Sequence, residues 1–570
     1  MSIVIPSVAR PCVVGLTALL LSGCLSVSTS STGGDATRDG QGFVARRDER
    51  VRIGAFTRID AVAVSRRFLY AASGGGIAVY DRWQERWMPP LTRDAGFLES
   101  QLSVLAGDPI EDALWIGVPG GVVIYRPDTE QLQRTAVVGI PDVIAFDRSG
   151  TGDALVRSGG TWTRVSRIGM ATPSGPPSAA TLVIPPTLET LMRQYPQLRT
   201  ANAAWLQRPL PNRPLPRLAV VSGAAAPERA SEVWLGTDRF GLYRVDPVSF
   251  TSRHVPYGLR EPGVGALAPA LDGVWAAGLG LIEGDAEGGV TFTTSDLQRW
   301  RWIDGTIARP LTGRAVAMAS RANRLWIAYV GALVRVFTDG AQDVKGWSTL
   351  DGLADARTLA VAPAGDGAYV ATMRGVQFVS DSIPEGVRNR RDAVADERAP
   401  SRPRAVGPVL LPDVPVEALQ LIGDTLWAGT PAGLIGIAGP RQSATRIRPS
   451  LPSRRPVRAL AWSDTALIAA TDDGIFQMHP RRDVPAVRLD ALSTTSVGAV
   501  TRVAIDARAI AVAGTDGVLV QSRRTGALRL LSASQLPGPV LDIVAQGGWW
   551  WLGTPQGLVR LARDGDGLPR

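Results

Sequence analysis

A short motif recurs along this chain at a nearly constant spacing. Each copy has a large apolar residue, often Trp, then one or two small residues, a turn and an apolar pair. Clear copies are Leu114–Gly117 followed by Gly121–Val123, and Val233–Thr237 followed by Gly241–Tyr243. A motif repeated at a fixed period indicates that the chain consists of copies of one structural unit, so the period constrains the fold.

The large apolar residue of the motif marks eleven units. Most neighbouring marks are 39 to 45 residues apart, which suits one four-stranded blade of a β-propeller. We expect the Trp to be a wedge packed between blades; the alternative, a row of ligand-stacking surfaces, is disfavoured because packing explains one residue type repeated around a ring. The marks are Tyr70, Trp115, Val156, Trp234, Trp275, Trp326, Tyr369, Trp427, Ile468, Val512 and Trp551.

Each unit contains short apolar runs separated by Gly, Pro and Asp. Runs such as Val122–Tyr125 and Leu333–Val336 are too short and too closely spaced for helices, and continuous apolar runs suit strands covered on both faces. Turns such as Thr515–Gly517 place Asp before Gly, which favours tight hairpin turns. The sequence therefore predicts an all-β fold, with β-propeller architecture and about eleven four-stranded blade units.

The links between units resemble those of the two-component regulator propellers. Thr349–Leu353 followed by Thr358–Val361 is similar to that family's repeat, and so is Arg93–Phe97. The resemblance covers most of residues 58–380 and 415–563. It implies a propeller and a sensory or binding role, because in that family the repeat commonly forms the periplasmic sensory part of signalling proteins. The chain shows no kinase segment and no second membrane span, so we do not expect it to signal across a membrane alone.

Two stretches interrupt the repeat. Residues 168–230 are rich in Pro and Ala, and apolar residues at roughly helical spacing within Thr187–Tyr195 and Gln197–Gln207 predict a short helical pair inserted between blades. Residues 381–410 hold few apolar residues and several Arg and Pro, which is typical of a linker.

Eleven blades exceed the four to eight of a typical ring, so we expect two propellers. The linker predicts a first set of blades over residues 43–380 and a second set over residues 411–570. The last unit ends before a fourth strand is complete, and residues 43–56 would supply that strand and close a ring. The second propeller would then borrow N-terminal blades; one large ring shared by all units is the alternative.

Residues 1–23 resemble a bacterial lipoprotein signal peptide. An apolar run ends in Leu21–Cys24, which resembles the lipobox, where the chain is cut before a Cys that carries the lipid. This resemblance implies lipidation of Cys24, with residues 24–42 as a flexible tether. Leu25 rather than Asp follows the Cys, which by similarity to proteobacterial sorting implies the outer membrane, with the propeller facing the periplasm.

Composition argues against several classes of site. Cys24 is the only Cys left after removal of residues 1–23, and His254 and His479 are the only His. Each His stands alone, so we expect solvated side chains and neither a zinc site nor a Ser–His–Asp triad. Gly278–Gly280 and Asp564–Asp566 lack the context of a dinucleotide loop and a calcium loop. We therefore predict no catalytic residue, no cofactor and no metal.

The net charge of +9 comes almost entirely from Arg spread among Asp and Glu. This dispersion and the periplasmic address argue against nucleic acid as a partner. We expect a binding module for an envelope protein or glycan, with the Pro-rich insertion as the best candidate contact. A propeller enzyme, a lyase or a quinone-dependent dehydrogenase, is one alternative. A scaffold for outer-membrane protein assembly is another, by analogy of fold alone.

The lipid anchor is tested by metabolic labelling. Labelled palmitate is expected to enter the wild-type protein and to be absent from Cys24→Ser, because the thiol of Cys24 is the predicted acceptor. Gel fluorography of the purified proteins measures this, and an unlabelled wild-type protein would contradict the prediction.

Overall fold

The computed structural model describes most of the chain after residue 48. Among these residues the strands form eleven antiparallel sheets, ten of four strands and one of five, which confirms the predicted all-β architecture. Residues 41–570 form one compact unit. The described residues are 49–97, 101–147, 153–178, 182–199, 219–249, 251–280, 288–304, 313–338, 344–381, 406–441, 444–447, 451, 454–480, 482, 484–492 and 496–570.

The first four sheets in chain order make up the four-blade group, residues 61–255. Its strands are β2 (Ala61–Val64), β3 (Phe68–Ser73), β4 (Gly76–Asp81), β5 (Arg86–Leu91), β6 (Val104–Gly107), β7 (Leu114–Val118), β8 (Gly121–Arg126), β9 (Gln131–Ala136), β10 (Pro141–Asp147), β11 (Ala154–Ser158), β12 (Thr161–Val165), β13 (Ala171–Ser174), β14 (Leu182–Val183), β15 (Val220–Ala226), β16 (Arg229–Thr237), β17 (Leu242–Asp246) and β18 (Thr251–Val255). The helical elements of the described residues are α1 (Leu188–Gln194) and the short 3-10 helices η1 (Arg93–Ala95), η3 (Pro196–Arg199), η4 (Thr349–Asp351) and η7 (Ala533–Gln535).

The other seven sheets make up the seven-blade ring, residues 266–562 together with residues 50–53. Its strands are β1 (Arg50–Ile53), β19 (Ala266–Ala270), β20 (Gly273–Ala277), β21 (Gly289–Thr294), β22 (Trp300–Asp304), β23 (Ala315–Arg321), β24 (Arg324–Tyr329), β25 (Ala332–Phe337), β26 (Val344–Trp347), β27 (Thr358–Pro363), β28 (Gly367–Thr372), β29 (Gly375–Ser380), β30 (Val406–Leu410), β31 (Ala418–Ile422), β32 (Thr425–Thr430), β33 (Gly433–Ala438), β34 (Thr445–Ile447), β35 (Val457–Ser463), β36 (Ala466–Thr471), β37 (Gly474–Met478), β38 (Val487–Arg488), β39 (Val500–Ile505), β40 (Ala509–Gly514), β41 (Gly517–Ser522), β42 (Leu528–Ser532), β43 (Asp542–Gln546), β44 (Trp549–Thr554) and β45 (Gly557–Ala562).

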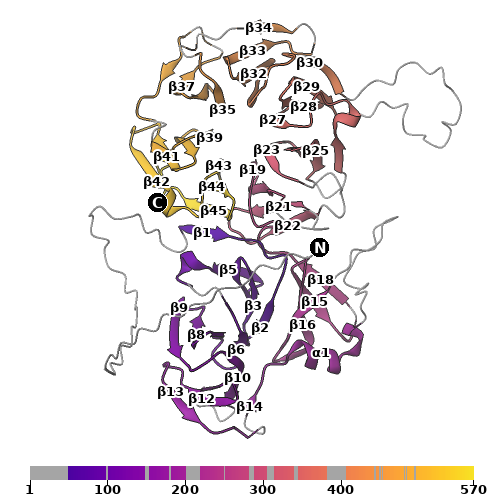
Figure 1. The fold of residues 1–570 in the computed structure, drawn as a ribbon, viewed down its shortest axis with the longest axis vertical. Coiled ribbons are helices and arrows are strands. Elements are labelled where there is room, and N and C mark those ends of the chain that lie inside the picture. The colour runs from indigo at the N-terminus through magenta and orange to yellow at the C-terminus, as the bar shows by residue number, and fades with distance from the viewer. Residues whose placement is uncertain are drawn as a thin grey trace, which may run out of the picture. The chain divides into compact units, whose positions relative to one another are not determined.

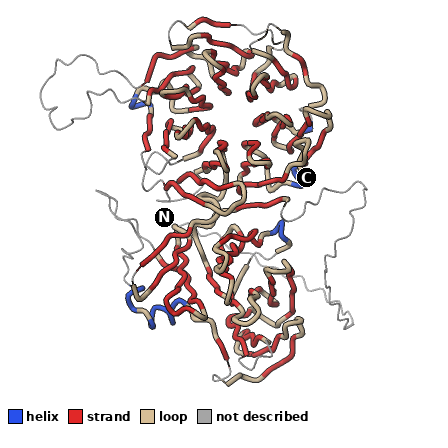
Figure 2. The backbone as a smooth tube through the Cα atoms, turned by 180° about the vertical axis from the view of Figure 1, so that it is seen from behind, coloured by secondary structure: helices blue, strands red, loops and turns tan. Residues whose placement is uncertain are grey.

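The innermost strands of the seven-blade ring pack side by side around a common centre (Figure 1). The contacts run from β19 through β23, β27, β31, β35 and β39 to β43, and β43 contacts β19 again. Figure 2 shows the same ring of sheets from behind. This closed series of contacts identifies a β-propeller.

The last blade of the ring is completed by the start of the chain. β1 pairs antiparallel with β45, from Arg50 opposite Leu561 to Ile53 opposite Leu558. The sheet order is therefore β1, β45, β44 and β43, with the N-terminal strand outermost. Residues 43–56 were expected to supply the missing fourth strand, and this is confirmed for Arg50–Ile53.

The division of the blades differs from the predicted one at residues 381–410. β30 lies within that stretch and pairs with β29 of the same blade, so the stretch interrupts one blade and does not separate two sets. The blades before and after it belong to the same ring, and the two groups of blades are instead joined by residues 54–60 and 256–265. Similar repeats cannot reveal which blades are neighbours, and this is why the sequence misplaced the boundary.

The helical insertion is confirmed in part, within the residues that the structure describes. α1 falls inside the predicted helix Thr187–Tyr195, while Pro196–Arg199 forms the 3-10 helix η3. The rest of the second predicted helix, beyond residue 199, lies outside the described residues. β13, β14, the whole of β15 and the first residues of β16 also lie within residues 168–230, so this stretch contributes strands to two blades as well as the helix.

The residues that mark the repeat act as wedges, as predicted. All eleven lie on a strand that pairs with the innermost blade strand that precedes it, and four of the six Trp marks are almost completely buried. Their side chains face neighbouring blades, and Trp551, for example, belongs to the hydrophobic cluster at the junction of the two groups. Burial of this extent excludes them as ligand-stacking surfaces. These four are Trp115, Trp234, Trp326 and Trp551.

The two links that carry the family resemblance adopt the same local structure. Each is a 3-10 turn, η1 or η4, that ends at a Gly with positive φ, 85° at Gly96 and 106° at Gly352. Residues with a Cβ rarely adopt this backbone conformation, so the Gly at the end of each link follows from the turn.

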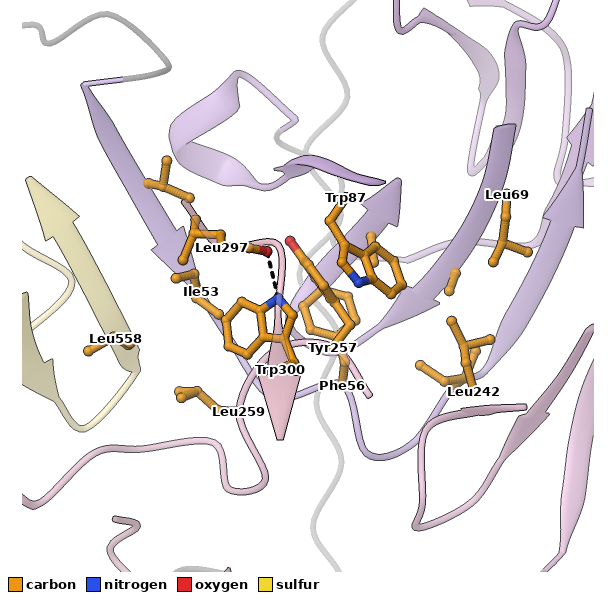
Figure 3. Packing of buried hydrophobic residues seen from close by; sticks show 14 of the residues in the cluster. Ile53, Phe56, Leu69, Trp87, Leu242, Tyr257, Leu259, Leu297, Trp300 and Leu558 are labelled. Carbon is orange, nitrogen blue, oxygen red and sulfur yellow. Dashed lines mark hydrogen bonds between the residues drawn. The ribbon is translucent and has the colours of Figure 1, made fainter. Parts of the chain in front are cut away.

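Buried aromatic residues join the four-blade group to the seven-blade ring (Figure 3). The ring of Tyr257 lies 4.1 Å from that of Trp87, 5.0 Å from that of Phe56 and 5.2 Å from that of Trp300, measured between centroids. The Gln298 side chain also exchanges two hydrogen bonds of 2.9 Å with the main chain of Trp87. The two groups thus share one hydrophobic core across their junction.

Because β1 closes the ring, Ile53→Ala is expected to destabilise the folded protein strongly. Ile53 is completely buried, and removal of such a side chain is expected to lower the free energy of unfolding by about 3 kcal/mol. Arg52→Ala on the same strand is the control, with an expected change within about 0.5 kcal/mol. Denaturant unfolding monitored by Trp fluorescence measures both, and equal midpoints for the two variants would contradict this role of β1.

Candidate functional site

The innermost strands of the four-blade group enclose a cavity of about 460 Å³. Its walls come from β2, β6, β10 and β15, whose labels locate it in Figure 1. This volume lies within the usual range of ligand pockets, and the lining is mainly apolar, as in most such pockets. The strand residues of the wall include Val62, Val104, Leu105, Val143, Ile144, Val221 and Ala224.

The insertion forms a further wall of this cavity. β14 adds to the inner edge of β10, where Val183 pairs with Phe146 and Leu182 with Asp147. Pro185 follows closely, and because Pro has no N–H donor the strand pairing ends there. The chain from Val183 to Leu188 lines the cavity, so the predicted contact region does contribute to the site.

The same segment bridges the third and fourth blades. β15 packs against β2, β2 against β6, and β6 against β10, but among the described strands β10 and β15 lack comparable packing. α1 begins at its cap Thr187, whose side-chain oxygen accepts a hydrogen bond of 3.3 Å from the Thr190 amide. Leu191 of α1 is fully buried against β16 residues such as Leu235. The insertion therefore takes the place of a direct contact between two blades.

The polar side chains of the cavity wall already have partners. Asp60 accepts a hydrogen bond of 2.6 Å from Arg58, and Asp142 lies 3.0 Å from the Arg157 guanidinium. Ser222 donates to a main-chain carbonyl at 2.7 Å. The wall is thus mainly apolar in its side chains, and β2, β6 and β15 each end a sheet, so they add main-chain N–H and C=O groups along one edge.

A buried ion pair fixes the first blade of the group against the fourth. Glu232 accepts hydrogen bonds of 2.8 Å from both Arg82 and the Trp234 indole, and Arg244 lies 3.4 Å away. Burial alone would raise the pKa of Glu232, but these hydrogen bonds and positive charges outweigh it and hold the pKa below its usual value. The first and fourth blades, which both contribute to the cavity wall, are therefore joined by the ionised carboxylate of Glu232.

The centre of the seven-blade ring holds a second cavity, of about 420 Å³. Asp542, which lines this cavity, accepts a hydrogen bond of 2.7 Å from the Leu267 amide and lies 3.5 Å from Arg502. Burial raises the pKa of this carboxyl, and the Arg502 charge and two amide donors oppose the effect only in part. Because Asp542 opens β43 and Leu267 belongs to β19, this charged group joins the first and last blades and serves the closure of the ring.

A third cavity, of about 620 Å³, lies beside the first two blades of the seven-blade ring. Trp275 and Phe292 line it, but their rings pack on each other, with centroids 5.0 Å apart. Among its charged residues, Arg299 pairs with Asp272, and Arg301 and Arg321 donate hydrogen bonds to main-chain carbonyl groups. The cavity of the four-blade group differs from this one in lying on a central axis and in having a wall built by the insertion.

The sequence-predicted residues do not gather at any of these cavities. Cys24 lies outside the described residues. His479 is half-buried, and its Nδ1 lies 2.8 Å from the Thr465 carbonyl oxygen. Among the described residues, no group of three or more His, Cys, Asp or Glu side chains is placed to hold a metal ion.

His254 is not the solvated side chain that we expected. Its ring packs between Tyr243 and Trp302, with centroids 5.0 and 5.4 Å away, and its Nε2 lies 2.8 Å from the Phe240 carbonyl oxygen. The expectation was wrong because β18 is an outer strand of one blade that meets Trp302 of the next group. No local sequence signal reveals such a contact.

Two short motifs have structural uses. The Asp564 carboxylate accepts hydrogen bonds of 2.9 and 2.8 Å from the amides of Asp566 and Leu568, which closes a turn. The Gly280 amide donates to the buried carboxylate of Glu261 at 2.8 Å. Each motif therefore has a local structural function.

No protein-family model matches the sequence, and no curated protein matches it. Among solved structures, the extracellular domain of BT4673 from B. thetaiotaomicron is 14% identical, with a TM-score of 0.35 and with 89% of this chain and 72% of that chain covered. PorZ, a surface component of the type-IX secretion system of Porphyromonas gingivalis, is 11% identical, with a TM-score of 0.35 and coverage of 90% and 87%. The WD40 propeller domain of Doa1 is 11% identical, with a TM-score of 0.35 and coverage of 53% and 92%.

These likenesses carry no argument about function at such identities and TM-scores. The propeller architecture rests on the sheets and their contacts. The similarity of the links to two-component regulator propellers likewise remains a resemblance.

The buried ion pair predicts a pH-dependent loss of stability in Glu232→Gln. The variant leaves the Arg82 charge buried without its counter-ion, so the free energy of unfolding is expected to fall by about 3 kcal/mol at pH 7. The pKa of Glu232 is lowered in the folded protein, so its contribution is complete above about pH 4.5 and is lost as the pH falls through the folded-state pKa. The difference between variant and wild type should therefore shrink in acid.

Urea unfolding at pH 7 and pH 3.5 measures this difference. Glu228→Gln is the control, because Glu228 is half-exposed and lies 3.6 Å from Arg66. Such a pair is expected to contribute less than about 1 kcal/mol. A difference for Glu232→Gln that stays constant with pH would contradict the role of the charge.

Proposed function

We propose that this protein is a binding module of the bacterial envelope, and that the cavity of the four-blade group holds an apolar part of its partner. The observation that carries this proposal is the cavity itself, with its four strand walls and the further wall built by residues 183–188. The wall carries apolar side chains that solvent would otherwise contact, and their burial by a ligand is favourable.

The chemistry of the wall favours a protein partner over a glycan. Sugar recognition needs hydrogen-bonding side chains with free capacity and exposed aromatic faces. The polar side chains of this wall are engaged with Arg58, Arg157 and a carbonyl group. Among the described residues that line the cavity there is no aromatic side chain. The same engagement supports a non-catalytic role, because paired carboxylates at the wall are poor general bases.

The proposal includes the envelope address. The lipobox-like sequence ending in Cys24 would attach the chain to the outer membrane through lipid, with the blades on the periplasmic side. In the part of the chain that the structure describes, no helix combines the length and the apolar character needed to cross a membrane.

Photo-crosslinking in intact cells tests the site. A photoreactive amino acid at Ile184, an exposed side chain at the cavity wall, is expected to yield adducts with a defined envelope protein that mass spectrometry identifies. Val143→Trp in the same chain should reduce these adducts at least about tenfold, because Val143 is half-buried at the wall and a Trp there fills the cavity.

Val248→Trp is the matched control. Val248 is exposed on the four-blade group and does not line the cavity, so its substitution should leave the adducts unchanged. Adducts that survive Val143→Trp as well would count against the cavity as the binding site.

A further inference from the structure

We propose that the occupant of this cavity is an extended apolar peptide segment of a partner protein, which pairs as an additional strand with the inner edge of β2 or β15. This inference rests on the function proposed above and specifies its ligand. Three observations support it. Innermost strands have an unpaired edge, β14 of this chain already pairs with such an edge, and the cavity wall combines apolar side chains with main-chain hydrogen-bonding groups.

Innermost strands of the four-blade group have an unpaired edge toward the cavity. In the described sheets β2, β6 and β15 each stand at the end of a sheet, so each hydrogen-bonds to a neighbouring strand along one side. The other side presents main-chain N–H and C=O groups, which is the usual template for strand addition.

β10 shows that a strand fits beside an innermost strand in this cavity. β14 is the chain's own two-residue strand, antiparallel to β10 on its inner edge. The pairing covers only Phe146 and Asp147 of β10, because Pro185 and Pro186 follow and cannot continue it. One of the four inner edges is therefore partly occupied by a strand. In the described sheets the other three pair with no strand on that side, although α1 packs against β15.

The wall combines apolar side chains with main-chain hydrogen-bonding groups. A hydrocarbon ligand would bury those N–H and C=O groups without partners, which is unfavourable. A sugar would leave the apolar side chains, such as Val143 and Leu105, against hydroxyl groups. A peptide strand supplies main-chain donors and acceptors along its edges and apolar side chains on both faces, so it matches both properties of the wall.

The strand lengths set the size of the segment. β2 has four residues and β15 has seven, so a partner segment of four to seven residues would pair along their length. At about 3.3 Å per residue such a segment spans roughly 13–23 Å. It should be uncharged, because the carboxylates of the wall, Asp60 and Asp142, are already paired with Arg.

A synthetic peptide tests the pairing. The probe is acetylated Thr-Leu-Val-Ile-Val-Thr amide with a fluorophore and two flanking Lys for solubility; its first four residues copy residues 181–184. Two further probes have esters in place of alternate amide bonds. The first replaces the odd-numbered bonds and the second the even-numbered bonds. Each replacement removes an N–H donor without adding bulk. Fluorescence anisotropy measures binding of the three probes to the full-length protein.

The parent peptide is expected to bind, and one ester probe should bind at least tenfold more weakly, while the ester probe of the other register keeps most of the affinity. Val143→Trp should abolish binding of the parent peptide, and Val248→Trp should not. Hydrogen exchange followed by mass spectrometry should show slower exchange in the peptides that cover β2 or β15 when the probe is bound, and unchanged exchange in β39.

Equal affinity of all three probes would overturn strand pairing and leave the proposed function intact, provided that Val143→Trp still blocks them. Failure of every probe to bind, while Val143→Trp still removes the cellular adducts at Ile184, would also overturn this inference without touching the binding function. If no probe binds and the cellular adducts at Ile184 also survive Val143→Trp, both the strand-pairing inference and the proposed function fail.

Discussion

The pairing of β1 with β45 is the interaction on which the rest of the structure depends. It completes the last blade of the seven-blade ring with a strand from the start of the chain, so the ring contains both ends of the described sequence. The residues that follow β1 then enter the junction, where Phe56 meets Tyr257 and the two groups of blades share one core. Loss of this pairing would expose the edge of β45 and weaken both groups.

Much of the fold could be predicted from the sequence, because the forces that define a blade act locally. The Trp-type wedge, the short apolar runs and the Gly of each link are all set within about forty residues, and all were recovered. The unfinished last unit even revealed the closing strand. The allocation of blades to rings could not be predicted, since the contact of β43 with β19 depends on curvature summed over seven similar units.

The candidate site could also be predicted only in part, because most of its walls depend on contacts between distant strands. The Pro-rich insertion was identified as a contact region because it breaks the repeat, and residues 183–188 do line the cavity. The other walls come from innermost strands, whose sequences resemble those of strands that line no such cavity. The packing of His254 against Trp302 was missed for a related reason, since the two residues belong to different groups of blades.

The insertion also has an evolutionary consequence. In a closed ring the width of the centre follows from the number of blades, and it changes only when a whole blade is gained or lost. In the four-blade group one side is bridged by a loop, a two-residue strand and a helix of seven residues. Changes in the length or sequence of that single segment can reshape the cavity while every blade keeps its packing, so specificity can diverge among relatives without a cost to the propeller framework.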